Sequence, residues 1–140
     1  MDYQALADEI NNDPEALGYG QHLPGDHNSI VALLKQDDPT GTTYFRTSIP
    51  MSEVYAEVEW VNEWLALTDV EREGFRELTS TDAFDASSQN VRDAVEAIFG
   101  NGSQTWANLG GIVTRPARRE EVVLERGSSV TSQDVAKALQ

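Results

Sequence analysis

The chain has 140 residues, of which 39% are hydrophobic and 24% are charged, with no cysteine and a formal net charge of −14 at pH 7. These values fit one globular domain over residues 1–140 and exclude disulfides, thiolate nucleophiles and Cys-ligated zinc. Direct binding to nucleic acid is not expected, because affinity for phosphates comes from cations, and no apolar run is long enough to cross a membrane.

Acidic residues are concentrated in the first half of the chain. Residues 1–71 hold 14 Asp or Glu against two basic residues, a net charge of −12, whereas residues 72–140 hold 10 against 8, a net charge of −2. Such acidity keeps a protein soluble and apart from like-charged neighbours, which is the simpler interpretation. It is also compatible with a basic protein partner or with the imitation of DNA.

Two helices are predicted near the N-terminus. Apolar residues recur at helical spacing over residues 2–11, and Asp2 lies near the positive end of this helix. A second helix is expected to begin near Asp26 or Asn28 and to continue to Lys35, where two aspartates and a proline follow.

An extended segment is predicted between Pro39 and Pro50. Its Thr, Tyr, Phe and Ile residues favour β-structure, but no second convincing strand lies nearby in the sequence. Because an isolated strand needs a partner, we expect it to pair in a small hairpin or with another subunit. Three of its side chains are candidates for partner binding: Tyr44, Phe45 and Arg46.

The stretch from Met51 to Leu67 is predicted to form a central helix with Ser52 as its N-cap. Its apolar residues recur at helical spacing and define one buried face. The residues of this face are Val54, Val58, Val61 and Leu65, widened by Trp64 and Leu67. Tyr55 and Trp60 lie off the centre of the buried face, so we expect them to contact a partner.

Further helices are predicted in the second half of the chain. Capping boxes beginning at Thr68 and at Thr131 mark the starts of two of them. A clear amphipathic helix is expected over residues 88–99 and a shorter one around Trp106.

Two connections complete the predicted fold. Residues 79–88 are expected to form a polar loop, and Thr114 is placed to cap a helix that has Pro116 in its first turn. The fold class is therefore all-α: a compact bundle of about six to eight short helices around a central Trp-rich helix, with one extended segment near residues 40–50.

No catalytic motif stands out in the sequence. His22 and His27 have neither the spacing of a helical zinc pair nor a third ligand, which indicates a turn with two incidental histidines. Carboxylates four residues apart on the central helix are typical of a solvated face. These pairs are Glu53–Glu57 and Glu59–Glu63. Since there is also no phosphate-binding loop and no nucleophile elbow, we predict no catalytic residues, no metal and no cofactor.

One basic cluster consists of Arg115, Arg118 and Arg119. Salt bridges to neighbouring glutamates on a helix surface explain it most simply. The alternative is that it binds the acidic half of a neighbouring copy, because self-assembly of an acidic chain needs such a complement. The three arginines are therefore further candidates for partner binding.

Four blocks carry a resemblance that spans most of the chain: DYQALADEINNDPEALGYG, NVRDAVEAIFGNGSQT, GGIVTRPARREEV and VTSQDVAKAL. In this order they resemble a family of small tailed-bacteriophage proteins. The resemblance implies a component of the virion or of its assembly, with no catalytic residues to carry over. The segment from Asp38 to Pro50 departs from the family pattern, which marks it as a place where this member contacts its own partner.

Together these features predict a non-enzymatic bacteriophage structural protein, a neck, tail or capsid-associated component of the virion that is present in the host cytoplasm during assembly. Its expected partners are other virion proteins, including copies of itself, and neither nucleic acid nor a membrane. The alternative is an acidic DNA mimic or inhibitor that occupies a nucleic-acid-binding protein of the host. A hydrolase that uses paired carboxylates is a third hypothesis.

Overall fold

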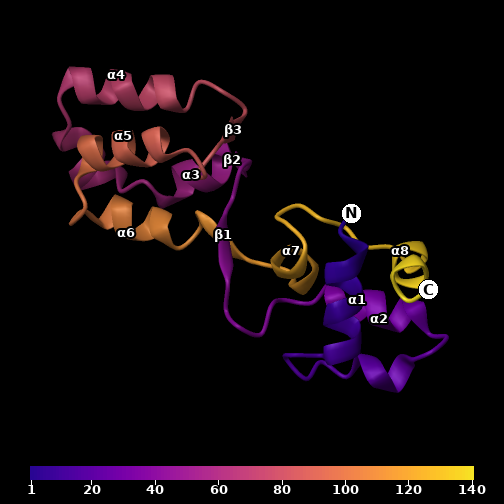
Figure 1. Ribbon diagram of the computed structural model, residues 1–140. Helices are drawn as coiled ribbons and strands as arrows, with labels where there is room; N and C mark the ends of the chain where they lie inside the picture. The colour runs from indigo at the N-terminus through magenta and orange to yellow at the C-terminus, as the bar shows by residue number, and fades with distance from the viewer. The chain divides into compact units, whose positions relative to one another are not determined.

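A computed structural model describes residues 1–140 and is mostly helical, with 54% helix and 9% strand. A largely helical fold is therefore confirmed, although its strands mean that it is not purely all-α. The chain forms two compact units (Figure 1). Unit 1 comprises Met1–Thr43 and Pro116–Gln140, and unit 2 comprises Tyr44–Arg115. The prediction of a single domain over residues 1–140 stays a prediction, and an unfolding experiment that tests it is given in the Discussion.

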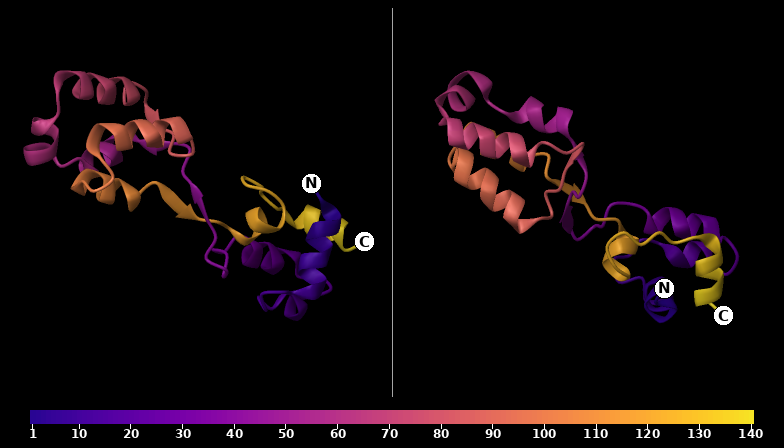
Figure 2. Two further views of the ribbon diagram at one scale, coloured as in Figure 1. Left: turned by 60° about the vertical axis from the view of Figure 1, so that its left-hand side comes forward. Right: turned by 90° about the horizontal axis from the view of Figure 1, so that it is seen from above.

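Unit 1 is a cluster of short helices with a core of its own. Its elements are α1 (Tyr3–Asn12), η1 (Tyr19–His22), α2 (His27–Leu34), α7 (Arg119–Val123) and α8 (Ser132–Ala138). Asp2, predicted to lie near the positive end of the first helix, caps it by accepting a hydrogen bond from the Ala5 amide, and Asp26, one of the two predicted starts of the second helix, accepts one from the Ser29 amide. Helix α8 packs against both α1 and α2 (Figure 2). The buried apolar residues are Leu6, Ile10, Tyr19, Ile30, Leu34, Val130 and Val135.

Unit 2 contains the tryptophans. Its helices are α3 (Met51–Glu57), the π-helical turn η2 (Trp60–Trp64), α4 (Asp69–Leu78), α5 (Gln89–Phe99) and α6 (Gln104–Gly110). Helix α5 lies beside both α4 and α6 (Figures 1 and 2). The capping box predicted at Thr68 begins α4. The core of this unit consists of Ile49, Val54, Val58, Phe75, Phe84, Ala86, Val95 and Leu109.

The predicted extended segment forms two short strands whose partners lie in the same chain. Strand β1 (Thr43–Phe45) pairs with β4 (Thr114–Pro116), and β2 (Ile49–Pro50) pairs antiparallel with β3 (Ala83–Phe84). Ile49 stands opposite Phe84, and both side chains are buried in the core of unit 2. Residues 79–88 are therefore not entirely the polar loop that was predicted.

The helix predicted to begin at Thr114 is wrong. Its first residues form β4 instead, and helix α7 begins only at Arg119. The backbone next to this strand is held by pairing rather than by a helix: the Ala117 amide donates to the Thr42 carbonyl oxygen at 2.8 Å, and the Asp38 amide donates to the Ala117 carbonyl oxygen at 2.7 Å. Because these backbone amide and carbonyl groups are already hydrogen-bonded to another segment, a helix at this position would have to break those bonds.

The single central helix from Met51 to Leu67 is also wrong, because the chain leaves helical geometry at Val58 and Glu59. The Val54 and Val58 side chains are buried as predicted. After the break, however, Val61 is 71% exposed and Leu65 is 64% exposed, so the buried face does not continue. Trp64 still packs against the core of unit 2.

The charge asymmetry seen along the sequence does not divide the two units. Each unit contains 12 acidic and 5 basic residues, which gives a net charge of −7 for unit 1 and −7 for unit 2. The difference disappears because the acidic residues between positions 53 and 71 belong to unit 2, while residues 116–140, with four acidic and four basic residues, add no net charge to unit 1.

Candidate functional site

Exposed apolar side chains gather in one stretch of unit 2. Of the seven large hydrophobic residues that are exposed, five lie between residues 55 and 70. These five residues, here called the 55–70 surface, are Tyr55, Trp60, Val61, Leu65 and Val70. Scattered single hydrophobic residues are normal on a protein surface, but a concentration of this kind is typical of a protein interaction site.

The break after α3 determines which side chains the 55–70 surface exposes. At the break, the Glu59 amide donates to the Thr105 hydroxyl oxygen at 2.9 Å. The Glu59 carboxylate turns back and accepts hydrogen bonds from three successive amides, which begins the next helical turn. These amides belong to Val61, Asn62 and Glu63. The new turn places Val61 and Leu65, four residues apart, on the same side of the chain and in water.

A second carboxylate ties this turn to the rest of unit 2. Glu63 accepts hydrogen bonds from the backbone amides of Gln104 and Thr105, both at 2.7 Å, where α6 begins. Hydrogen bonding from Thr105, which exceeds the opposing effect of burial, lowers the pKa of Glu63. The 55–70 surface is therefore attached to a packed scaffold, as a pre-organised binding site requires.

Aromatic rings in edge-to-face contact connect the exposed part of this surface with the core. The Trp60 ring lies 5.3 Å from the Trp64 ring, and the Trp64 ring lies 5.5 Å from that of Phe75, which is buried. The Trp60 indole also donates to the Tyr55 carbonyl oxygen at 3.0 Å. With its polar group satisfied, Trp60 presents apolar area on a fixed ring, which is the property of aromatic anchors at protein interfaces.

The charge within residues 55–70 is acidic, although two arginines of α4 border it: Arg72 donates to the Leu65 carbonyl oxygen at 2.7 Å, and the Arg76 guanidinium lies 5.8 Å from the centre of the Trp64 ring. Residues 55–70 contain four acidic residues and no basic residue. Glu59 and Glu63 use their carboxylates for hydrogen bonds within the unit, while Glu57 makes no side-chain bond to the protein. A partner that matches this surface has apolar side chains with basic residues at their margin.

The predicted contact residues of the extended segment all bind within unit 2. The Arg115 guanidinium lies 5.8 Å from the centre of the Tyr44 ring, and the Arg92 guanidinium lies 3.9 Å from that of Phe45. Arg46 forms a bidentate ion pair with Glu53, whose shorter bond is 2.8 Å. The roles of Tyr44, Phe45, Arg46 and Arg115 in partner binding stay predictions, as do those of Tyr55 and Trp60.

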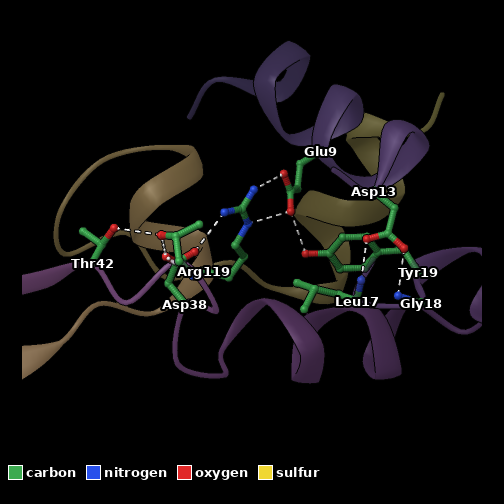
Figure 3. A network of polar contacts seen from close by, with 9 residues as sticks. Glu9, Asp13, Leu17, Gly18, Tyr19, Asp38, Thr42 and Arg119 are labelled. Atoms are coloured by element: carbon green, nitrogen blue, oxygen red, sulfur yellow. Dashed lines mark hydrogen bonds and ion pairs between the residues drawn. The ribbon is translucent and has the colours of Figure 1, made fainter. Parts of the chain in front are cut away.

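Arg119 lies in the interior of unit 1 and not on its surface, where the sequence analysis placed it. Its Nε and Nη2 atoms donate to the two carboxylate oxygens of Glu9, each at 2.8 Å, and Nη1 donates to Asp38 Oδ1 at 2.8 Å (Figure 3). The Tyr19 hydroxyl also donates to Glu9 Oε1, at 3.0 Å. Because all of these side chains are buried, Arg119 has a structural role and is withdrawn as a surface contact.

The network around Arg119 fixes the charge states of its members. Hydrogen bonds that Arg119 donates to Glu9 raise the pKa of Arg119, against the opposing effect of burial. Burial tends to raise the pKa of Asp38, but hydrogen bonds from Thr40 and Arg119 outweigh it and lower the pKa. Burial and the neighbouring Glu9 carboxylate raise the pKa of Tyr19, so this phenol stays protonated and continues to donate.

Arg118 is half-exposed but is also engaged within unit 1. Its guanidinium lies 3.1 Å from Glu120 and 3.2 Å from Glu121, and both carboxylates are fully buried. Glu121 Oε2 accepts from the Gly127 amide, and Glu120 Oε2 accepts from the Val130 amide. Glu120 Oε1 receives no well-directed hydrogen bond, so its only partner is the Arg118 charge. The partner-binding role of Arg118 stays a prediction.

No group of three or more His, Cys, Asp or Glu side chains is arranged to hold a metal ion. His22 Nδ1 lies 3.4 Å from Asp26, the N-cap of α2, and His27 Nε2 lies 3.1 Å from the Pro24 carbonyl oxygen. Three of the four carboxylates in the candidate acid pairs, those of Glu53, Glu59 and Glu63, make the structural contacts described above. No helix has the length and apolar character needed to span a bilayer.

Comparison of the chain with protein-family models, with curated proteins and with solved structures gives no match.

Proposed function

We propose that the protein is a non-enzymatic bacteriophage structural protein, a neck, tail or capsid-associated component of the virion that acts through protein–protein contacts. The observation that carries the proposal is the 55–70 surface, where fixed aromatic and aliphatic side chains face water in an otherwise strongly acidic protein. Exposed apolar surface is unfavourable in water, and a partner that covers the 55–70 surface removes this free-energy cost.

The bacteriophage part of the proposal rests on the sequence. The N-terminal block DYQALADEINNDPEALGYG and the three later blocks resemble small tailed-bacteriophage proteins in the same order. The partners are then other virion proteins and copies of this chain. During assembly of the particle, the free protein is present in the host cytoplasm.

The proposal is tested by mass spectrometry of purified particles from the phage that encodes the chain. We expect the protein in the particles in a fixed ratio to the major capsid protein, and its absence would refute the proposal. The doubly substituted Val61→Ser, Leu65→Ser chain, supplied in a phage that lacks its own copy, should enter particles less efficiently. Ala97→Ser is the matched control, because Ala97 is also exposed on a helix of unit 2 but lies outside the 55–70 surface.

The formal charge of −14 favours a second candidate, an acidic mimic of DNA that binds a nucleic-acid-binding protein of the host. Against it, several carboxylates are buried and neutralised inside unit 1 rather than displayed in an external row. These are Glu9, Asp38, Glu120 and Glu121. This candidate predicts capture of a DNA-binding protein from host lysate in a complex that salt weakens, and failure of capture at low salt would dismiss it.

A further inference from the structure

A second apolar site lies in unit 2 between α5 and α6, away from the 55–70 surface. It is a groove of about 310 Å³, and none of its lining residues belongs to the 55–70 surface. Buried Phe84 and Val95 and the partly exposed Phe45 contribute to its lining. This volume is at the lower end of the range for small-molecule pockets, and it suits one or two large side chains of a partner better than a cofactor.

The two walls of the groove differ in polarity. Trp106, Leu109 and Gly110 line it from α6, followed by Val113, at spacings of three and four residues. The α5 wall has the same helical spacing but is polar. It consists of Gln89, Arg92, Asp93 and Glu96. An occupant that fits both walls must be apolar toward α6 and polar toward α5.

The charges of the α5 wall indicate the sign of the occupant. The Arg92 guanidinium is engaged by the Phe45 ring, and it donates to the Ala86 carbonyl oxygen and to Gln89, each at 2.6 Å. The Glu96 carboxylate is exposed and has neither a hydrogen bond nor an ion pair within the protein. The wall holds one basic residue, Arg92, and two acidic residues, Asp93 and Glu96, so its net charge is negative and its complement is a cation.

We propose that the α5–α6 groove binds an amphipathic helix of a partner protein, with its apolar side against α6 and with Lys or Arg along the side that faces Glu96. The polar wall spans residues 89–96, about 10 Å along α5, which is about two turns of a bound helix. Gly110 forms a notch in the apolar wall, because a Cβ at this position would meet nothing within 4 Å. Recognition then follows the helix-in-groove mode, with a few apolar anchors and a charged margin.

Gly110 and Gly102 supply a matched pair of variants. Gly110→Leu places a side chain in the groove, whereas Gly102→Leu adds the same side chain to the same unit outside it. Both positions have open space around the new Cβ, and neither has a left-handed backbone conformation. Far-UV circular dichroism of both variants checks the fold. Glu96→Lys is a second test at an exposed position, where folding is not at stake.

The experiment uses the full chain and a fluorescent Leu–Lys amphipathic peptide of about 18 residues, with a scrambled peptide of the same composition as the control. We expect the amphipathic peptide to bind the natural chain and Gly102→Leu equally. Gly110→Leu should weaken peptide binding about tenfold or more, which is the effect of excluding one buried apolar anchor. Glu96→Lys should also weaken peptide binding and should reduce the dependence of the affinity on salt.

Four results would each overturn this proposal: no binding to the natural chain, equal binding of the scrambled peptide, equal binding to the two leucine variants, or a dimer of the natural chain that Gly110→Leu dissociates. The last would assign the groove to a second copy. Because the groove and the 55–70 surface share no residue, failure here leaves the test of virion incorporation unaffected.

Discussion

Replacement of the buried arginine, Arg119→Met, should be among the most destabilising single changes in unit 1. It removes three hydrogen bonds of 2.8 Å and leaves two carboxylates without their cation, Glu9 at 4% side-chain exposure and Asp38 at 0%. Breaking a buried pair by removing one partner typically costs about 3–5 kcal/mol. With a urea m-value of about 2 kcal/mol per molar, the unfolding midpoint should fall by about 2 M.

Urea unfolding followed by far-UV circular dichroism measures this change. Lys35→Met is the control, because Lys35 is exposed at the end of α2 and its removal should cost about 1 kcal/mol or less. Arg119→Lys should give an intermediate loss, since an ammonium keeps the charge but lacks the planar bidentate geometry. A loss below about 1 kcal/mol for Arg119→Met, the level of an exposed ion pair, would refute the account of this network.

Other predictions concern cooperativity, capping and pH. All three tryptophans lie in unit 2, whereas Arg119 lies in unit 1. If residues 1–140 unfold as a single domain, Arg119→Met should lower the urea midpoint measured by tryptophan fluorescence as much as the midpoint measured by circular dichroism. An unchanged fluorescence midpoint would contradict the single domain. Glu63→Gln should lower the free energy of unfolding by about 1 kcal/mol, because it weakens the hydrogen bonds at the start of α6. Urea unfolding followed by tryptophan fluorescence measures this change. An unchanged midpoint would show that these hydrogen bonds do not stabilise unit 2. The folded-state pKa values of Asp38 and Glu63 are lowered, so their contribution is present above the unfolded pKa values and is lost as the pH falls through the folded ones. Urea midpoints should therefore fall as the pH is lowered below about 5, less steeply in Glu63→Gln, and equal slopes would contradict the assignment.

Local signals predicted four helix starts and missed two, because Ser52 lies inside α3, whose N-cap is Pro50, and Thr114 begins a strand. Asp2 and Asp26 cap α1 and α2, and the capping boxes at Thr68 and Thr131 begin α4 and α8. These features need only neighbouring residues, because the capping side chain and the amide that it satisfies are about three positions apart. Such signals are contained in the sequence itself.

The features that sequence reasoning missed depend on distant partners. The break at Glu59 follows from its contact with Thr105, and the burial of Arg119 follows from Glu9, which is 110 positions away. An Arg-Arg-Glu-Glu run is typical of a solvated helix, and nothing local distinguishes it from a buried one. Strands β2 and β3 have two residues each, too few for a period to be recognised.

The 55–70 surface was predicted in part, for a similar reason. Tyr55 and Trp60 lay off the centre of the helical stripe and were expected to be contacts, and both are exposed. Val61 and Leu65 were placed in the core, because the stripe was extended through the break. The sequence held no signal of the break, because Glu59, which caps the new turn in the structure, is not of a residue type that favours the N-cap position.

Site-specific photo-crosslinking inside assembled particles tests the central claim most directly, namely that the 55–70 surface is covered by another protein of the virion. A benzophenone amino acid is placed at position 61 in one sample and at position 97, also exposed in unit 2, in the other. We expect mass spectrometry to find cross-links from position 61 to a virion protein, in clear excess over those from position 97. Particles that contain the protein but give equal or no cross-links from position 61 would contradict the claim.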